Sequence, residues 1–316
     1  MLSVQEGELW LCVASDHDEP DIDVTLTPIR QVTADELEAW QSVRSRLSEA
    51  TVNSSFHLLT GDAGRALASC VELIESWHDE PSRASEDRVR HVKASFRAFL
   101  SGMRAFLDQT AHELSKTHGR RSDAVQAFRL MTSEVYDNSL AYRVCYALRN
   151  ASQHAGQVVN HVRFRSTEIG TGDIDAWSQI GVHGPKIARD LSEMKAAVRS
   201  ELAAHSHPLA LEKLIHFCML GCERIFAQAF LCNERELEAA VAVVARYERE
   251  LQTIGGQAMC FQTISATPAA ITSHSIDLHW VENGDAITVR RVLRQSREML
   301  KTSVQIVDQE TLAFDT

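Results

Sequence analysis

The sequence contains few of the features that mark specialised classes of protein. Aromatic residues make up 6% of its 316 residues, and there are only 6 prolines and 14 glycines, with no internal repeat or low-complexity tract. Seven cysteines, an odd number without repeated spacing, predict reduced thiols rather than a disulfide framework. No segment has the run of about 18 apolar residues that a membrane helix needs, and the start, MLSVQEGELW, has no basic or apolar leader. We therefore expect a cytoplasmic protein without a membrane partner.

The familiar catalytic and cofactor motifs are also missing. There is no Ser-His-Asp elbow, no H-E-x-x-H and no paired carboxylate motif, and the glycines of GTGDIDAW and TIGGQ lack the Lys-Ser/Thr of a phosphate loop. Cys218 and Cys222, with His216 nearby, have the chemistry of zinc ligands, but their spacing inside an apolar helix is typical of buried core cysteines. The sequence therefore predicts neither a metal nor an organic cofactor.

Hydrophobic periodicity predicts a mainly α fold, a helical bundle with small β elements near the N- and C-termini. Three segments are expected: 1–82 with strands and helices, 83–257 with the bundle, and 258–316 with a small β/α element. Strands are predicted at 8–15, 23–32 and 157–167, and helices at 34–50, 65–80, 85–119, 122–155, 187–204, 208–232 and 234–253, with a Gly-rich link at 168–186. Thr33 is the expected N-cap of the first helix, Gly119 ends the third, and Asn283-Gly284 is expected to form a hairpin turn.

The net charge of −11 argues at first against nucleic acid as a partner, because a phosphate backbone calls for a basic surface. The distribution of charge points the other way. Residues 83–165 carry 14 Lys and Arg against 7 Asp and Glu, whereas the rest of the chain carries 18 against 36. A basic segment of this kind suits a nucleic acid; the alternative is that its charges only solvate helix faces.

The most informative stretch is YRVCYALRNASQHAG, residues 142–156, in which an apolar helix ends in polar residues. With 26 Arg and 14 His in the chain, chance alone gives about one Arg followed five positions later by His, and requiring Asn directly after the Arg lowers that number to about 0.02. Asn150 and His154 stack on one helix face, beside Arg149. His154 lies in the last turn before Gly156, where the helix dipole favours an imidazolium suited to proton transfer. The alternative is that Arg149 and His154 only cap the last carbonyls of the helix.

This stretch resembles the signature of the HEPN superfamily, an Arg-polar-x-x-x-His motif on a late helix of an all-α bundle. The matching positions are Tyr142-Arg143, Leu148-Arg149-Asn150 and His154, within about fifteen residues. Many members are metal-independent endoribonucleases of toxin-antitoxin or phage-defence systems, and they act as dimers that bring two motifs into one cleft. In one subfamily the antitoxin modifies a Tyr two residues after the His; here that position is Gly156. The resemblance implies an HEPN-like bundle, a homodimer, RNA as substrate and a cognate antitoxin protein as a further partner.

The resemblance also implies a role for each polar residue. Cleavage of RNA without a metal uses the 2′-hydroxyl as nucleophile, a group that moves its proton, and a cation on the crowded phosphorane. His154 would move the proton, Arg149 would stabilise the phosphorane, and Asn150 would orient either group. The RNA phosphates would be held by Tyr142, Arg143, Arg163 and Arg165. His161 is a weaker candidate for a second acid or base. The alternative function is a noncatalytic HEPN-like module that binds a nucleotide or a partner protein and uses the motif structurally.

Overall fold

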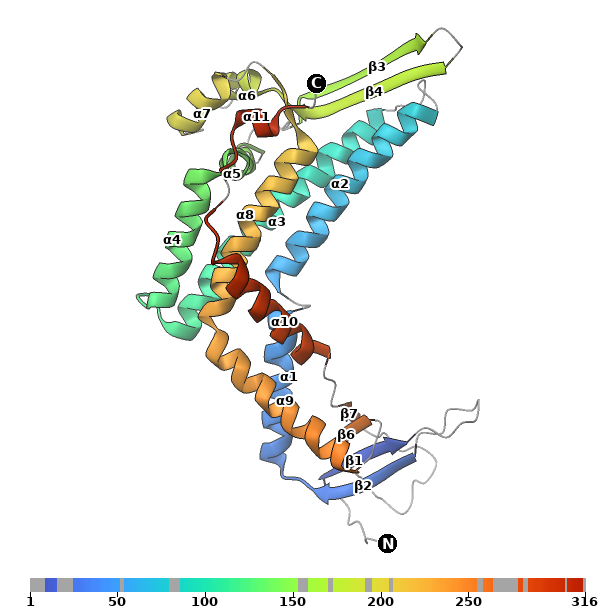
Figure 1. Cartoon of the computed structure of the whole chain (residues 1–316), viewed down its shortest axis with the longest axis vertical. Helices are drawn as coiled ribbons and strands as arrows, with labels where there is room; N and C mark the ends of the chain where they lie inside the picture. The colour runs from blue at the N-terminus through green and yellow to red at the C-terminus, as the bar shows by residue number, and fades with distance from the viewer. Residues whose placement is uncertain are drawn as a thin grey trace. The chain divides into compact units, whose positions relative to one another are not determined.

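The computed structural model of the chain is mainly α-helical, as the sequence predicted (Figure 1). It describes residues 9–15, 25–51, 54–79, 86–152, 159–169, 173–190, 195–204, 207–254, 258–263, 278–280, 284–304 and 306–314. The chain forms two compact units: unit 1 comprises Met1–Asn53 and Asn233–Arg294, and unit 2 comprises Ser54–Cys232 and Gln295–Thr316. These units divide the chain differently from the three predicted segments, because each unit combines stretches that lie far apart in the sequence.

Unit 1 combines a small antiparallel sheet with helices. The sheet has the strand order β2-β1-β6-β7, built from β1 (Leu9–Ser15), β2 (Thr25–Gln31), β6 (Ala258–Thr263) and β7 (Leu278–Trp280). The helices are α1 (Ala34–Ala50), α9 (Glu234–Ile254) and the part of α10 (Gly284–Met299) that extends to Arg294. Leu11 of β1 lies opposite Phe261 of β6. The β elements predicted near the two ends of the chain thus belong to one sheet.

The first helix begins where the sequence predicted. Thr33 has extended backbone angles, and its hydroxyl accepts a hydrogen bond from the Glu36 amide at 3.2 Å, which satisfies a free amide of the first turn. Trp40 of α1 is buried and meets Tyr247 of α9 edge-to-face, with 5.4 Å between ring centroids. This aromatic contact joins α1 to α9.

A charged network reinforces the same junction. Arg30 of β2 donates to both carboxylate oxygens of Glu36, at 2.6 and 3.0 Å, and to Glu250 of α9 at 2.9 Å. The hydroxyl of Tyr247 donates to Glu36 at 2.9 Å. The hydrogen bonds from Arg30 are the main cause that holds the pKa of Glu36 below its ordinary value, and burial opposes them in part. The ionised form of Glu36 is therefore the one that stabilises unit 1.

Replacing Glu36 with glutamine is expected to destabilise unit 1 by about 1 kcal/mol at neutral pH, because the network is only partly buried. Since the folded-state pKa of Glu36 is lowered, its contribution is present above the unfolded-state pKa of about 4.3 and is lost as the pH falls through the folded-state value. Urea unfolding at neutral and at low pH measures this effect. The difference between wild type and Glu36→Gln should shrink on acidification, whereas the exposed Glu38→Gln control should show little difference at either pH. A difference that is the same at both pH values would contradict the prediction.

Unit 2 is a helical bundle with a small sheet. Its helices are α2 (Ser55–Asp79), α3 (Glu86–His118), α4 (Asp123–Asn138), α5 (Leu140–Ser152), α6 (Gly184–Asp190), α7 (Ala196–Ala203), α8 (Leu211–Cys232) and α11 (Gln309–Leu312). The sheet has the order β3-β4-β5, with β3 (His161–Ile169), β4 (Asp173–Val182) and β5 (Leu209–Ala210). Helices α2 and α3 pack side by side, and α8 lies against α2, α4 and α5 (Figure 1). Gly119 follows α3 with a φ of 93°, the left-handed conformation that ends a helix, as predicted.

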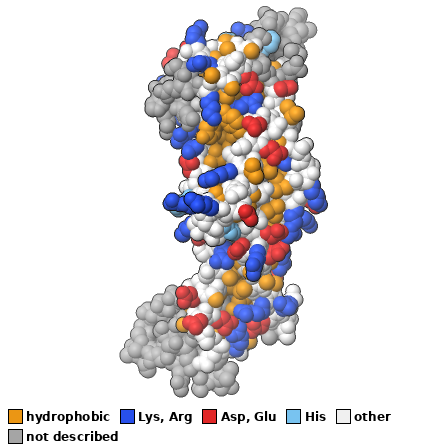
Figure 2. All heavy atoms as spheres, turned by 90° about the vertical axis from the view of Figure 1, so that its left-hand side faces the viewer, with side chains coloured by type: hydrophobic (Ala, Val, Ile, Leu, Met, Phe, Trp, Pro, Cys, Tyr) orange, Lys and Arg blue, Asp and Glu red, His pale blue; other side chains and the backbone are white. Residues whose placement is uncertain are grey.

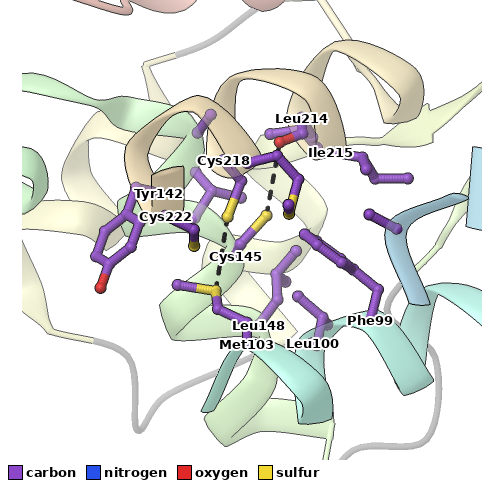
Figure 3. Packing of buried hydrophobic residues seen from close by; sticks show 14 of the residues in the cluster. Phe99, Leu100, Met103, Tyr142, Cys145, Leu148, Leu214, Ile215, Cys218 and Cys222 are labelled. Atoms are coloured by element: carbon purple, nitrogen blue, oxygen red, sulfur yellow. Dashed lines mark hydrogen bonds between the residues drawn. The ribbon is translucent and has the colours of Figure 1, made fainter. Parts of the chain in front are cut away.

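Helix α8 supplies much of the core of unit 2. No segment of the sequence was expected to suit a membrane, yet the 22 residues of α8 are apolar enough, by length and composition, to cross one. Of the apolar window, 61% is buried, and the core helix of a soluble protein passes the same test. Cys218 and Cys222 are fully buried, and Cys218 Sγ lies 3.5 Å from Met103 Sδ (Figure 3). Burial raises the pKa of the Cys218 thiol. The prediction of core cysteines is confirmed, and no group of three or more His, Cys, Asp and Glu within the described ranges could hold a metal ion.

Gly221 allows α8 to approach α4 and α5 closely. A β-carbon at this position would lie 2.6 Å from Cγ1 of Val135 and 3.4 Å from Cδ2 of Tyr142, and both of these residues are fully buried. Val135 is β-branched and restricted to few rotamers, so it cannot easily move aside. The absence of a side chain at position 221 therefore matters for packing.

Gly221→Ala is expected to destabilise unit 2 by about 1–3 kcal/mol, because the overpacked core outweighs the helix propensity of alanine. The matched control is Gly64→Ala in α2, where a β-carbon would meet nothing within 4 Å. That control should be neutral or more stable by up to about 1 kcal/mol. Urea unfolding of the two variants measures the contrast, and equal stabilities would show that α8 can shift without cost.

The structure corrects the prediction of one helix over 122–155. The helix breaks at Ser139, which has extended backbone angles and separates α4 from α5. Val307, near the C-terminus, pairs with the break: its amide donates to the Asn138 carbonyl and its carbonyl accepts from the Leu140 amide, both at 2.9 Å. The Ser139 hydroxyl accepts from the Tyr142 amide at 3.2 Å and caps α5. Apolar spacing continues on both sides of the break, so the pattern resembles a single helix.

Three smaller predictions are also corrected. Residues 168–186, expected to be a link, contain β4, which pairs antiparallel with β3. The helix expected over 187–204 is divided into α6 and α7. Gly284, expected to be part of a hairpin turn, begins α10, and Asn283 lies outside the described residues. The buried residues of α10 follow helical spacing and include Ala286, Val289, Leu293 and Ser296.

Candidate functional site

The predicted motif lies on α5, one side of which packs in the bundle. Its buried residues are Leu140, Ala141, Tyr142, Val144, Cys145 and Leu148. Figure 3 shows Cys145 facing Cys218 of α8, and Cys145 Sγ lies 3.9 Å from the Leu214 carbonyl. The other side of α5 carries three partly exposed polar residues, Arg143, Tyr146 and Arg149. This polar side is the candidate site.

The structure describes the side chain of one of the three predicted catalytic residues. Arg149 is partly buried in the last turn of α5, where its charge lies near the negative end of the helix dipole. Asn150 is the next residue of α5. The side chain of Asn150, and His154 and Gly156 entirely, lie outside the described residues. The geometry between Arg149 and His154 therefore stays a prediction.

Arg143 makes several contacts within the chain. Its Nη2 and Nε donate to the two carboxylate oxygens of Glu201 on α7, at 2.6 and 3.1 Å. Its Nη1 donates to the carbonyls of Tyr136 and Asp137, both at 2.8 Å. These carbonyls belong to the last turn of α4, where the break at Ser139 removes the usual helical donors. Arg143 ties α4, α5 and α7 together, and this structural use argues against its predicted role as a phosphate contact.

Tyr142 is fully buried next to Gly221 of α8. Burial raises the pKa of its hydroxyl above the ordinary value, and this hydroxyl has no hydrogen-bond partner among the described residues. Its ring packs edge-to-face on Tyr136, with 6.5 Å between centroids. A side chain enclosed by the core cannot reach a phosphate, so its predicted contact with RNA is corrected to a role in packing.

Sequence reasoning missed a basic residue that tertiary packing brings to α5. Arg104 of α3 donates from Nη1 to the Tyr146 hydroxyl at 2.9 Å and from Nε to Asp108 at 2.7 Å. Its guanidinium carbon lies 5.9 Å from the centre of the Tyr146 ring. Tyr146 packs edge-to-face on Tyr136, over which the ammonium of Lys195 lies at 5.1 Å. The only sequence signal for this group was an Arg-Asp pair four residues apart, which is common on helices.

The remaining predicted phosphate contacts lie on β3. Arg163 is exposed, whereas the side chain of Arg165 lies outside the described residues. His161, the weaker acid-base candidate, has its Nε2 3.3 Å from Oε1 of Gln179. Burial is the main cause that lowers the pKa of His161, the charges of Arg163 and His183 lower it further, and the hydrogen bond with Gln179 opposes them. The structure therefore favours the neutral form of His161.

The basic character of the site is partly balanced by carboxylates. On the face drawn in Figure 2, Lys and Arg side chains are interspersed with Asp and Glu. Two cations at α5 have acidic partners, since Arg104 pairs with Asp108 at 2.7 Å and Arg143 pairs with Glu201 at 2.6 Å. The candidate site is thus a set of oriented guanidinium groups beside tyrosine rings.

Fold and site together define a mainly α protein with a polar, tyrosine-lined motif helix. Comparison of the chain with protein-family models, with curated proteins and with solved structures gives no match. A functional assignment therefore depends on the chemistry of the residues on and around α5.

Proposed function

We propose that unit 2 is a metal-independent endoribonuclease of the HEPN type. The observation that carries this proposal is the position of Arg149-Asn150 in the last turn of α5, one turn after Tyr146, whose hydroxyl holds the guanidinium of Arg104. Guanidinium groups suit phosphate because their donors match its oxygens in pairs. The net charge of +7 over residues 83–165 supports an RNA partner for this part of an acidic chain.

In the proposed reaction the 2′-oxygen of the RNA attacks the adjacent phosphorus, and the bond from phosphorus to the 5′-oxygen breaks. His154 accepts the proton of the 2′-hydroxyl or donates one to the leaving oxygen. Arg149 stabilises the negative charge of the phosphorane, and Asn150 orients the phosphate or His154. The products are a 2′,3′-cyclic phosphate and a 5′-hydroxyl. A homodimer supplies a second motif and thus the second acid-base group that a single His154 lacks.

The proposed biological setting is a cytoplasmic toxin-antitoxin or phage-defence system. In that setting the nuclease acts on single-stranded RNA or tRNA, and a cognate antitoxin protein restrains it. Gly156 replaces the tyrosine that some HEPN antitoxins modify, so restraint of this chain requires a different contact.

The test is cleavage of a mixed pool of tRNA and single-stranded RNA in excess EDTA, followed by analysis of the product ends. Cleavage that leaves 2′,3′-cyclic phosphates in wild type and disappears in folded His154→Ala and Arg149→Ala would support the proposal. Sedimentation of the same samples measures the dimer. No cleavage of any RNA by a confirmed dimer would overturn the nuclease assignment.

A second candidate is a noncatalytic module that binds RNA, a nucleotide or a partner protein. The structural use of Arg143 and Tyr142 favours it, because two of the residues that match the HEPN signature serve packing and helix capping in this chain. In this case wild type binds RNA or a partner without cleaving RNA, and Arg149→Ala weakens binding alone.

A further inference from the structure

Arg104 is held in place from two sides. Nε is fixed by Asp108 on its own helix and Nη1 by Tyr146 on α5, at 2.7 and 2.9 Å. The side chain is 33% exposed, and within the described residues its Nη2 has no hydrogen-bond partner. A guanidinium fixed in this way loses little side-chain entropy when it binds an anion. Arg104 is therefore a partly exposed, positioned cation with Nη2 available to an anionic ligand.

Tertiary contact places this group beside the motif. Tyr146 lies 42 residues from Arg104 in the chain, and it precedes Arg149 by three residues and Asn150 by four. Residues at these separations are neighbours on one side of a helix. The guanidinium that Tyr146 holds therefore lies on the side of α5 that carries Arg149.

We propose that Arg104 is a second phosphate-binding residue of this site, with Tyr146 and Asp108 as its positioning residues. The inference rests on the proposed function, and it identifies the substrate class as an RNA backbone bound by two guanidinium groups from α3 and α5. The phosphorane carries more negative charge than the ground-state phosphodiester, so a second fixed cation stabilises the transition state more than the bound substrate. Arg104 should thus act on the rate of cleavage as well as on RNA binding.

The test compares wild type with Arg104→Ala, Arg104→Lys, Tyr146→Phe and Arg90→Ala. Arg104→Lys keeps the charge but loses the paired donors, and Tyr146→Phe removes one hydroxyl while keeping the ring on Tyr136. Arg90→Ala is the matched control, because Arg90 is an exposed arginine of α3 in a similar helical ion pair with Asp87. Two quantities are measured: kcat for RNA cleavage, and the salt dependence of binding to a fully 2′-O-methylated RNA, which cannot be cleaved.

Arg104→Lys is expected to lower kcat by about 10–100-fold with a smaller change in KM, and Tyr146→Phe by about 10-fold. Arg104→Ala should also reduce the slope of log affinity against log salt concentration by about 0.7, the value for one phosphate contact on a single strand. A purely structural role for Arg104 would leave that slope unchanged. Thermal melting of each variant verifies folding, and if Arg104→Ala does not fold, Arg104→Lys and Tyr146→Phe decide the question through kcat.

Each outcome separates this inference from the proposed function. If wild type cleaves RNA and the Arg104 variants match Arg90→Ala in kcat and in salt slope, the inference is wrong and the nuclease assignment stands. If wild type binds RNA without cleaving it, the nuclease assignment fails, and the salt slope still decides whether Arg104 contacts phosphate. If wild type neither binds nor cleaves RNA, both proposals are overturned.

Discussion

Replacement of Arg149 by alanine is expected to lower the rate of RNA cleavage by about 10²–10³-fold, the usual effect of removing one group that stabilises an oxyanionic transition state. His154→Ala should lower the rate of RNA cleavage by about 10²–10⁴-fold, because general acid-base catalysis contributes an effect of that size. Both losses should appear in kcat, with KM changed less, since the charge on the phosphorane develops only during the reaction. Single-turnover cleavage at saturating enzyme measures this.

The controls for this prediction separate catalysis from helix capping. Arg149 also lies in the last turn of α5, where a cation near the carbonyl end stabilises a helix by about 0.3–1 kcal/mol. Arg149→Lys keeps that charge but not the paired donors, so a capping role predicts near-normal activity, whereas the proposed role predicts a large loss. The control variants Arg129→Ala and His112→Ala replace exposed residues of the same basic segment. They should cleave RNA at the rate of wild type. Full activity in Arg149→Lys would assign Arg149 to the helix end.

Arg143→Ala is expected to destabilise unit 2 by about 2–4 kcal/mol, because it leaves the Glu201 carboxylate and two α4 carbonyls without their donor. The side chains of Arg143 and Glu201 are 16% and 32% exposed, so water replaces the lost contacts only in part. The loss should appear in urea unfolding followed by far-UV circular dichroism. Any loss of RNA cleavage in this variant should recover at lower temperature, where the folded fraction is restored.

A double-mutant cycle tests whether the pair itself carries that effect. Glu201→Gln alone should lower the free energy of unfolding less than Arg143→Ala does, because Arg143 keeps its hydrogen bonds to the Tyr136 and Asp137 carbonyls. The double variant should be less destabilised than the sum of the single ones, with a coupling of about 1–3 kcal/mol. Additive effects would show that Arg143 and Glu201 contribute to stability independently. If Arg143→Ala keeps full stability but loses RNA binding, Arg143 is a phosphate contact after all.

Local patterns in the sequence were sufficient for most helices. The N-cap at Thr33 depends on its own hydroxyl, which accepts a hydrogen bond from an amide three residues later. The helix end at Gly119 depends on a glycine backbone that adopts a positive φ. The core position of Cys218 and Cys222 also follows from the apolar spacing of a single helix. Predictions of this kind succeed because their causes lie within one or two turns of the chain.

The break at Ser139 depends on a partner far away in the sequence. Two hydrogen bonds with Val307 replace helical bonds at the junction of α4 and α5, and nothing between residues 122 and 155 encodes that pairing. The sheet of unit 1 has the same cause, because β1 finds its partner in β6 near the other end of the chain. Which distant segments pair depends on the free energy of the whole fold. The pattern of one helix or one strand carries no information about that choice.

The sequence by itself determined the amphipathic helices, the mainly α class and the motif residues Arg149 and Asn150 at the end of a helix. Only the tertiary structure decided which polar side chains surround that motif. It enclosed Tyr142 in the core, bound Arg143 to Glu201 and brought Arg104 to Tyr146. The physical reason is that helical periodicity specifies which side of a helix is buried, whereas the partners of a polar side chain depend on how different helices pack.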